Sequence, residues 1–194
     1  VAGFSAGAGY YSSLAFDSSD TPYLAYRDDD NSSKATVMKY DGSDWVTVGI
    51  AGFSAGDAYY VSLTLDSSQR PYVAYSDFAN GNKATLMKSD ICCGIWEVVG
   101  DAGFSENVAT LTSLALDSNG NPYVAYRDFA SDNKVTVMKY AVNVNEWVLG
   151  TAGTSQGDAT YISLALDSNN IPYVAYRDFS NGNKATMMSF NETK

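Results

Sequence analysis

The chain has 194 residues, 45% of them hydrophobic, so it is long enough to bury a core and too apolar to be disordered. Its formal net charge is −10, with 22 acidic and 12 basic residues, which argues against nucleic acid and anionic membranes as partners. No apolar run approaches the roughly 20 residues that a membrane-spanning helix needs, so we expect no membrane insertion.

Three sequence markers repeat in step along the chain, with spacings of 49, 51 and 50 residues. A Ser-Leu segment begins at Ser13, Ser62, Ser113 and Ser163. A Pro-Tyr segment begins at Pro22, Pro71, Pro122 and Pro172. A Lys-x-Thr segment begins at Lys34, Lys83, Lys134 and Lys184. A fixed period of this length indicates a repeat architecture. The sequence therefore predicts a single domain, 1–194, made of four units at about 1–49, 50–100, 101–150 and 151–194.

Each unit contains four strand-sized segments in the same order. In the third unit they span 111–117, 122–128, 134–140 and 146–150. Runs of this length that are rich in Val, Thr, Tyr and Trp are typical of strands and too short for ordinary helices. The connections carry turn-forming residues, and the Asn-Gly pairs at 80–81 and 181–182 predict tight hairpins between the second and third strands.

The strands do not alternate between apolar and polar side chains. In the run Tyr-Val-Ala-Tyr at 123–126 both faces are apolar, which is typical of a sheet covered on both sides. We expect Leu114 and Leu116 to fill the spaces between neighbouring sheets. The small residues Ser113 and Ala115 then suit a crowded innermost strand.

Residues 117–126, Asp-Ser-Asn-Gly-Asn-Pro-Tyr-Val-Ala-Tyr, resemble the second strand of NHL-type blades. The period and the Trp in the last strand are similar to kelch-type or lectin-type propellers. The resemblance covers nearly the whole chain and implies an all-β fold, a β-propeller of four antiparallel four-stranded blades. It implies a blade and not an activity. A β-sandwich of hairpins and a β-solenoid are the alternative folds.

The fourth unit stops one residue before the position of its Trp, so we expect its fourth strand to be missing from this chain. The edge of strand 184–190 then needs a partner, because an unpaired edge strand promotes aggregation. The N-terminal stretch, another chain or further units of a longer array could supply it. Four blades can close one ring or form half of an eight-bladed ring in a dimer, and we favour the single ring.

The loops between the second and third strands, together with the loops that enter each blade, are expected to share one face of the propeller. Aromatic rings there could stack on a sugar while Asn and Asp bond its hydroxyls. The candidate ligand-binding residues are Asp28, Asp29, Asp30, Asn31, Asp77, Phe78, Asn80, Asn82, Asp128, Phe129, Asp132, Asn133, Asp178, Phe179, Asn181 and Asn183 in the first set, and Phe4, Phe53 and Phe104 in the second. The alternative is structural: the phenylalanines cap the blade cores and the polar residues shape the turns.

An arginine precedes the recurring Asp in three units, at Arg27, Arg127 and Arg177, and Ser76 replaces it in the second. We expect these arginines and the recurring lysines to form a structural ion-pair ladder with that Asp.

Calcium is a possible cofactor, with candidate ligands at Asp28-Asp29-Asp30 and in the Asp-x-Asn-x-Asn stretch at 117–121, although turn formation explains the second stretch better. Catalysis has little support, because the chain has no His and the adjacent Cys92 and Cys93 therefore lack a His partner. The redox state of this cysteine pair is left open.

Together these features predict a non-catalytic binding or adhesion module, secreted or at the cell surface, that recognises glycans or proteins through its loops, with a homo-oligomer as a further alternative. A repeated weak site would bind multivalently. Two other interpretations remain: a structural spacer in a larger extracellular protein, and a hydrolase with two catalytic carboxylates.

Overall fold

The computed structural model describes residues 3–90 and 93–190, and over these residues the chain forms four antiparallel sheets. We call them blades 1 to 4. Blade 1 contains β1 (Gly9–Phe16), β2 (Pro22–Asp28), β3 (Lys34–Tyr40) and β4 (Trp45–Thr47), and blade 2 contains β5 (Ala58–Leu65), β6 (Pro71–Asp77), β7 (Lys83–Ser89) and β8 (Trp96–Val98). Blade 3 contains β9 (Ala109–Leu116), β10 (Pro122–Asp128), β11 (Lys134–Ala141) and β12 (Glu146–Thr151), and blade 4 contains β13 (Ala159–Leu166), β14 (Pro172–Asp178) and β15 (Lys184–Ser189).

The prediction of four propeller-type blades, the last with three strands, is confirmed by the order of strands in each sheet. Sequence-adjacent strands pair in every blade, and the register repeats: Asp28 lies opposite Lys34 in blade 1 as Asp128 lies opposite Lys134 in blade 3. Within the described residues no strand pairs with the outer edge of β15.

The connection between the second and third strands differs from the tight Asn-Gly hairpin that we predicted. In blades 1 to 3 it contains a single 3-10 turn, which in blade 2 spans Phe78–Asn80. Gly81 and Asn82 follow this turn with φ of 68° and 59°. The left-handed conformation that favours Gly and Asn is therefore present, but it ends a 3-10 turn instead of forming a two-residue loop.

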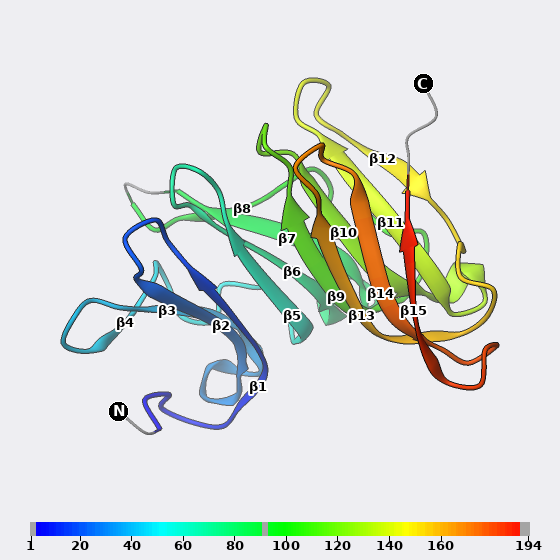
Figure 1. Ribbon diagram of the computed structural model, residues 1–194. Helices are drawn as coiled ribbons and strands as arrows, with labels where there is room; N and C mark the ends of the chain where they lie inside the picture. The colour runs from blue at the N-terminus through cyan, green and yellow to red at the C-terminus, as the bar shows by residue number, and fades with distance from the viewer. Residues whose placement is uncertain (1–2, 91–92, 191–194) are drawn as a thin grey trace.

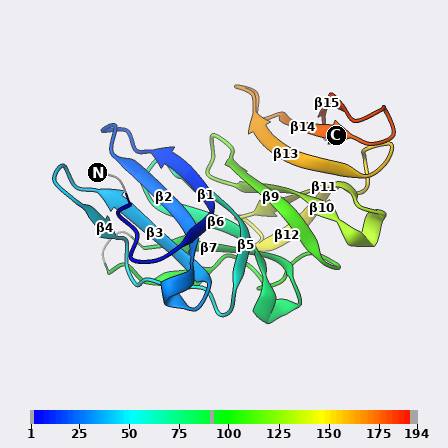
Figure 2. The ribbon, with the colours of Figure 1, turned by 90° about the horizontal axis from the view of Figure 1, so that it is seen from below.

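The four blades lie side by side in an arc (Figures 1 and 2). The first strand of each blade contacts the first strand of the next, in the order β1, β5, β9, β13. The single closed ring that we favoured is wrong, because blades 1 and 4 stand at opposite ends of the arc (Figure 2) and apolar side chains on both remain exposed.

Three apolar cores lie between consecutive blades, as the two-sided hydrophobic pattern predicted. Each blade has a forward face, turned towards the next blade, and a backward face, turned towards the previous one. In the first core, the forward face of blade 1 (Tyr23, Ala25, Ala35, Val37) packs on the backward face of blade 2 (Leu63, Val73, Tyr75, Met87). The second and third cores are built from the equivalent residues of the following blades. Leu114 and Leu116 fill the space between blades 2 and 3, as expected.

Hydrogen bonds join the blades at recurring positions. The hydroxyl of a Ser in each first strand accepts from the N–H of a Leu in the next blade, at 2.9 Å from Leu63 to Ser13, 3.0 Å from Leu114 to Ser62 and 2.9 Å from Leu164 to Ser113. Ser113 thus combines a small side chain with a hydroxyl that bonds the next blade. Apolar packing and hydrogen bonds therefore both join each blade to the next.

Several buried tyrosines have a raised pKa. Burial, aided by the charge of Asp28, raises the pKa of Tyr26 to about 12, and burial also raises the pKa of Tyr75 and Tyr126. In the unfolded chain the same tyrosines have a pKa of about 10, so as the pH rises they lose their protons in the unfolded chain before they do so in the folded one. We expect stability to be unaffected by these groups below about pH 10 and to fall as the pH rises towards 12. In a spectrophotometric titration, phenolate absorbance from the buried tyrosines should therefore appear together with the loss of β-sheet circular dichroism; if it appeared while the sheet signal was intact, this expectation would be wrong.

Candidate functional site

The recurring Asp at the end of each second strand is buried, in the four positions Asp28, Asp77, Asp128 and Asp178. Each carboxylate accepts a hydrogen bond from a Thr hydroxyl in the third strand. The Thr–Asp distances are 2.8 Å from Thr36, 2.9 Å from Thr85, 2.7 Å from Thr136 and 3.4 Å from Thr186. These carboxylates are directed into the protein.

The same Thr hydroxyls continue the network into the next blade. They accept from the N–H groups of Gly52 at 2.9 Å, Gly103 at 2.8 Å and Gly153 at 3.2 Å. Each of these glycines enters the following blade with a positive φ. The Asp–Thr–Gly network therefore ties the second and third strands of one blade to the entry loop of the next.

The polar residues of the same loops mostly shape the turns. The Asn31 and Asn80 side-chain amides donate to the buried Asp of their own turn, each at 2.8 Å. Four candidates have positive φ, as turn residues do: Asn82, Asp132, Asn133 and Asn183. Asp30 and Asn181 are exposed, and Asp29 forms an ion pair with Arg27 at 3.3 Å.

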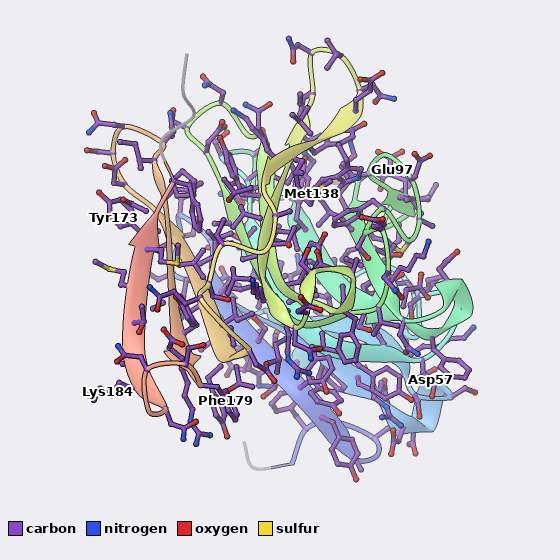
Figure 3. The ribbon with its side chains drawn as sticks, turned by 90° about the vertical axis from the view of Figure 1, so that its right-hand side faces the viewer. Asp57, Glu97, Met138, Tyr173, Phe179 and Lys184 are labelled. Carbon is purple, nitrogen blue, oxygen red and sulfur yellow. The ribbon has the colours of Figure 1, made fainter. Side chains whose placement is uncertain are left out.

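The two sets of phenylalanines occupy different environments. Phe78, Phe129 and Phe179 are exposed at the ends of their blades. Figure 3 shows Phe179 near Lys184, at the opposite end of the β14–β15 hairpin from Tyr173.

Phe4, Phe53 and Phe104 instead stack on the Trp of their own blade. The ring centroids are 4.3 Å apart for Phe4 and Trp45, 3.8 Å for Phe53 and Trp96, and 3.6 Å for Phe104 and Trp147. One face of each Phe ring is therefore covered by an indole.

The predicted ion-pair ladder is wrong. The buried Asp bonds to Thr, and the arginines reach other partners: Arg127 makes two bonds of 2.8 Å to Asp158 in the next blade, and Arg27 lies over the ring of Tyr59, also in the next blade. Arg177 lies over Phe179, with 5.1 Å from the guanidinium carbon to the ring centroid. No carboxylate among the described residues pairs with Arg177.

Each first strand contains a β-bulge that the sequence analysis did not identify. The ladder of each blade shifts register within its first strand, and the residue at the shift has a positive φ. These residues are Tyr11, Tyr60, Leu111 and Tyr161. Bulky side chains rarely adopt this conformation, and such strain concentrates at functional sites. The only sequence signal was an aromatic or Leu two residues before the Ser-Leu marker, and φ cannot be read from it.

Three of the bulged residues meet at a pocket that we call the axial pocket, with a volume of about 380 Å³. Its lining consists of Tyr60, Thr110, Leu111, Arg127, Phe129, Thr160, Tyr161 and Arg177. Two polar atoms of this lining, the hydroxyls of Thr110 and Thr160, are buried without a hydrogen-bond partner. Tyr161 is 75% exposed. Of the sequence candidates, Phe129 alone lies in the lining.

A larger groove of about 610 Å³ lies between blades 2 and 3 at the other end of the strands. Its charged side chains already have partners: Arg70 bonds Asp66 at 2.7 Å, and Lys88 bonds Glu97 at 3.1 Å. Each of these pairs therefore neutralises its own charges.

No cluster of three or more His, Cys, Asp or Glu that could hold a metal is formed by residues 3–90 and 93–190. Asp117 accepts hydrogen bonds from Asn119 and Asn121 in its own turn, so turn formation is its role here. Cys93 is exposed, and Cys92 lies outside the described residues. Calcium binding stays a prediction, and the redox state of the cysteine pair stays open. Among the described residues, no helix has the length and apolarity to cross a membrane.

Comparison with known proteins shows likeness at the level of fold. No protein-family model and no curated protein sequence matches the chain. Among solved structures, AofleA from Arthrobotrys oligospora is 13% identical with a TM-score of 0.68, over 93% of this chain and 53% of that one. A variant of Aleuria aurantia lectin in complex with Fucα1-6GlcNAc is 11% identical with a TM-score of 0.62, over 94% of this chain and 60% of the lectin.

An endo-1,4-β-xylanase from Bacteroides thetaiotaomicron is also similar, with 14% identity and a TM-score of 0.60 over 98% of this chain and 74% of the enzyme. The chain spans just over half of the length of AofleA and of the Aleuria lectin. The fold is thus that of lectin-like propellers, and the same fold occurs in an enzyme. The NHL and kelch types stay predictions.

Proposed function

We propose that this chain is a carbohydrate-binding propeller module without catalytic activity, and that the axial pocket holds the sugar. The observation that carries the proposal is the combination of exposed aromatic rings, an arginine without a carboxylate partner and two buried hydroxyls without partners in one pocket. Sugar sites need these groups, because a sugar has an apolar face and a rim of hydroxyls.

The contacts available to a sugar follow from the lining. The ring of Tyr161 offers the stacking surface, with Phe129 on the neighbouring blade. Arg177 keeps guanidinium donors for hydroxyl or carboxylate oxygens, whereas Arg127 is held by Asp158. The hydroxyls of Thr110 and Thr160 gain partners when a ligand or water enters. Satisfying a buried polar group is worth about 1–3 kcal/mol, so a polar ligand is favoured over an apolar one.

The fold neighbours support a carbohydrate as the class of ligand. One is a lectin bound to Fucα1-6GlcNAc, and AofleA has been solved both unaltered and as a variant with three arginines replaced by alanine. A secreted or cell-surface location accompanies this proposal, since most glycans that such modules would meet lie outside the cell.

A hydrolytic reaction is less well supported at this pocket. Glycosidases of the common type need two carboxylates about 5–10 Å apart beside the scissile bond. The lining of the axial pocket contains no Asp or Glu, and the nearby Asp158 is engaged by Arg127. The residues present can bind and orient a sugar, but they do not provide an acid and a base.

We expect Tyr161→Ala to weaken glycan binding by about tenfold or more, since an aromatic stacking contact is worth roughly 0.5–1.5 kcal/mol beyond its buried area. The ligand is first sought on an array of neutral and acidic glycans that includes Fucα1-6GlcNAc, and affinity is then measured by titration calorimetry. Tyr161→Phe should retain binding. Phe78→Ala is the matched control, because Phe78 is an exposed ring of another blade outside the pocket.

Two results would contradict the proposal. One is that no glycan binds at millimolar concentration. The other is that a glycan binds and neither Tyr161→Ala nor Arg177→Ala changes its affinity.

A further inference from the structure

Each end of the arc presents one of the two kinds of face that pack together between blades inside the molecule. Inside the molecule, a forward face packs on a backward face three times. The forward face of blade 4 and the backward face of blade 1 have no neighbour among the described residues. The forward face of blade 4 is formed by Tyr173, Ala175, Ala185 and Met187, and the backward face of blade 1 by Leu14, Leu24, Tyr26 and Met38, the residues equivalent by repeat position to those of the first core. On the backward face Tyr26 is itself buried and Leu24 and Met38 are half-buried, so Leu14 is the exposed member of this set.

The forward face of blade 4 has the composition of a face that is buried elsewhere. Met187 is 66% exposed, whereas the equivalent Val37 and Leu86 are 0% exposed. Ala175 and Ala185 are exposed too, while Ala25 and Ala35 in blade 1 are fully buried. Nothing in the side chains of blade 4 adapts this face to water.

The backward face of blade 1 shows the same contrast. Leu14 is 56% exposed, whereas Leu63, Leu114 and Leu164 are 6%, 7% and 8% exposed. Phe16 beside it is 58% exposed. Contiguous exposed apolar side chains of this kind mark an interaction surface.

The hydrogen-bonding groups that join two blades are also divided between the two ends of the arc. Inside the molecule the Ser hydroxyl of one blade accepts from the Leu N–H of the next, as Ser113 does from Leu164 at 2.9 Å. At the open ends the corresponding groups are the hydroxyl of Ser163 and the N–H of Leu14. A second recurring bond joins the N–H of Ala35 to the hydroxyl of Ser54 at 2.9 Å. Its counterparts are Ala185 and Ser5.

The entry segment of blade 1 already has the conformation that the entry segments of blades 2 and 3 adopt when they pack on a preceding blade. The φ of Gly3 is 67°, close to 64° at Gly52 and 66° at Gly103. The Ser5 hydroxyl donates to the Gly7 carbonyl at 2.8 Å, as Ser54 does to Gly56 at 2.7 Å. A preformed surface binds with a smaller loss of conformational entropy.

We propose that two copies of this chain associate head to tail, with the forward face of blade 4 of each copy packed on the backward face of blade 1 of the other. A second copy carries both missing halves, so two equal contacts leave neither face open. Eight blades lie within the range in which propellers close. A head-to-tail contact that closes gives a ring, and one that does not gives a growing filament. This inference is independent of the proposed sugar site.

The test is the mass of the chain in solution, measured without ligand by light scattering after size exclusion and by sedimentation across a range of concentrations. We expect twice the mass of one chain. Met187→Glu and Leu14→Glu should each weaken the dimer by about 100-fold, because each would bury an unpaired carboxylate in the contact. Both positions are exposed in the single chain, so the variants should fold, which circular dichroism checks. Ile95→Glu, at an exposed apolar position outside both faces, should stay dimeric.

Mixing the two variants tests the direction of the contact. The Met187→Glu chain keeps an intact backward face, and the Leu14→Glu chain keeps an intact forward face. The mixture should therefore form a heterodimer through one intact contact, although each variant alone is monomeric.

Four outcomes would overturn the proposal. They are a monomer at concentrations of about 100 μM, a dimer that both variants leave unchanged, a mixture that stays monomeric, and oligomers larger than two. Because Tyr161→Ala should remain dimeric, a failure of the sugar proposal and a failure of this one give different results.

Discussion

Asp77→Ala is expected to lower the free energy of unfolding by about 3–5 kcal/mol. Asp77 is buried and accepts three hydrogen bonds, from the Thr85 hydroxyl at 2.9 Å, the Asn80 amide at 2.8 Å and the Ala79 N–H at 3.1 Å. Hydrogen bonds to charged groups are worth about 1.5–3 kcal/mol, and their loss leaves buried donors without an acceptor. A change of this size is a large part of the stability of a small domain.

Two comparisons separate the network from burial alone. Asp77→Asn keeps the shape and one acceptor oxygen, so its effect should be smaller, about 1–2 kcal/mol. Asp178→Ala should also cost less than Asp77→Ala, because its Thr186 bond is long, at 3.4 Å, and no following blade of the same chain extends the network. This comparison is made in the Met187→Glu background, which keeps blade 4 without a neighbour. The exposed Asp101→Ala is the control. Urea denaturation followed by circular dichroism measures all four. Equal losses for Asp77→Ala and Asp101→Ala would show that the network does not hold the blades together.

Trp96→Ala is expected to cost about 3–5 kcal/mol, the range found when a buried aromatic side chain is truncated. Trp96 is almost fully buried, stacks on Phe53 at 3.8 Å, and donates its indole N–H to the Val48 carbonyl of blade 1 at 3.1 Å. It therefore closes the core of its own blade and joins that blade to the previous one.

The matched control is Trp45→Ala. Trp45 stacks on Phe4 in the same way, but it lies at the open end of the arc, where no preceding blade supplies a carbonyl. Trp45→Ala should lower the free energy of unfolding by at least about 1 kcal/mol less than Trp96→Ala does. This difference is roughly the net value of the hydrogen bond and of the packing against a second blade. The comparison is made in the Leu14→Glu background, which keeps the first blade without a neighbour. If both substitutions lower the free energy of unfolding equally, the packing between blades contributes less to stability than the structure indicates.

The repeated architecture could be predicted from the sequence because the features that specify a blade are local. The strand pattern and its turns predicted β10 over 122–128 at the observed bounds, and the two-sided apolar run at 123–126 predicted the sheets covered on both faces. Strand propensity, side-chain alternation and turn chemistry act within a few residues, so they repeat wherever the sequence does.

The candidate site was less accessible to sequence reasoning, for a physical reason that two kinds of residue show. Asp77 and Phe53 belong to the residue types that bind sugars, and their burial depends on Thr85 and Trp96, which lie eight and 43 positions further along the chain. Tyr161 gains its importance from a bulge and from Arg177 and Phe129 beside it, and nothing in its own neighbourhood of sequence marks it.

By itself the sequence determined the blade: its period, its strands, its two apolar faces and the residue types at its turns. The tertiary structure alone decided which of the repeated carboxylates and rings are internal, where the axial pocket lies and that the four blades form an open arc. The reason is that equivalent residues have the same local preferences, whereas their exposure depends on whether another blade stands beside them. Leu14 and Leu63 are alike in sequence context, and only the neighbouring blade buries one and leaves the other in water.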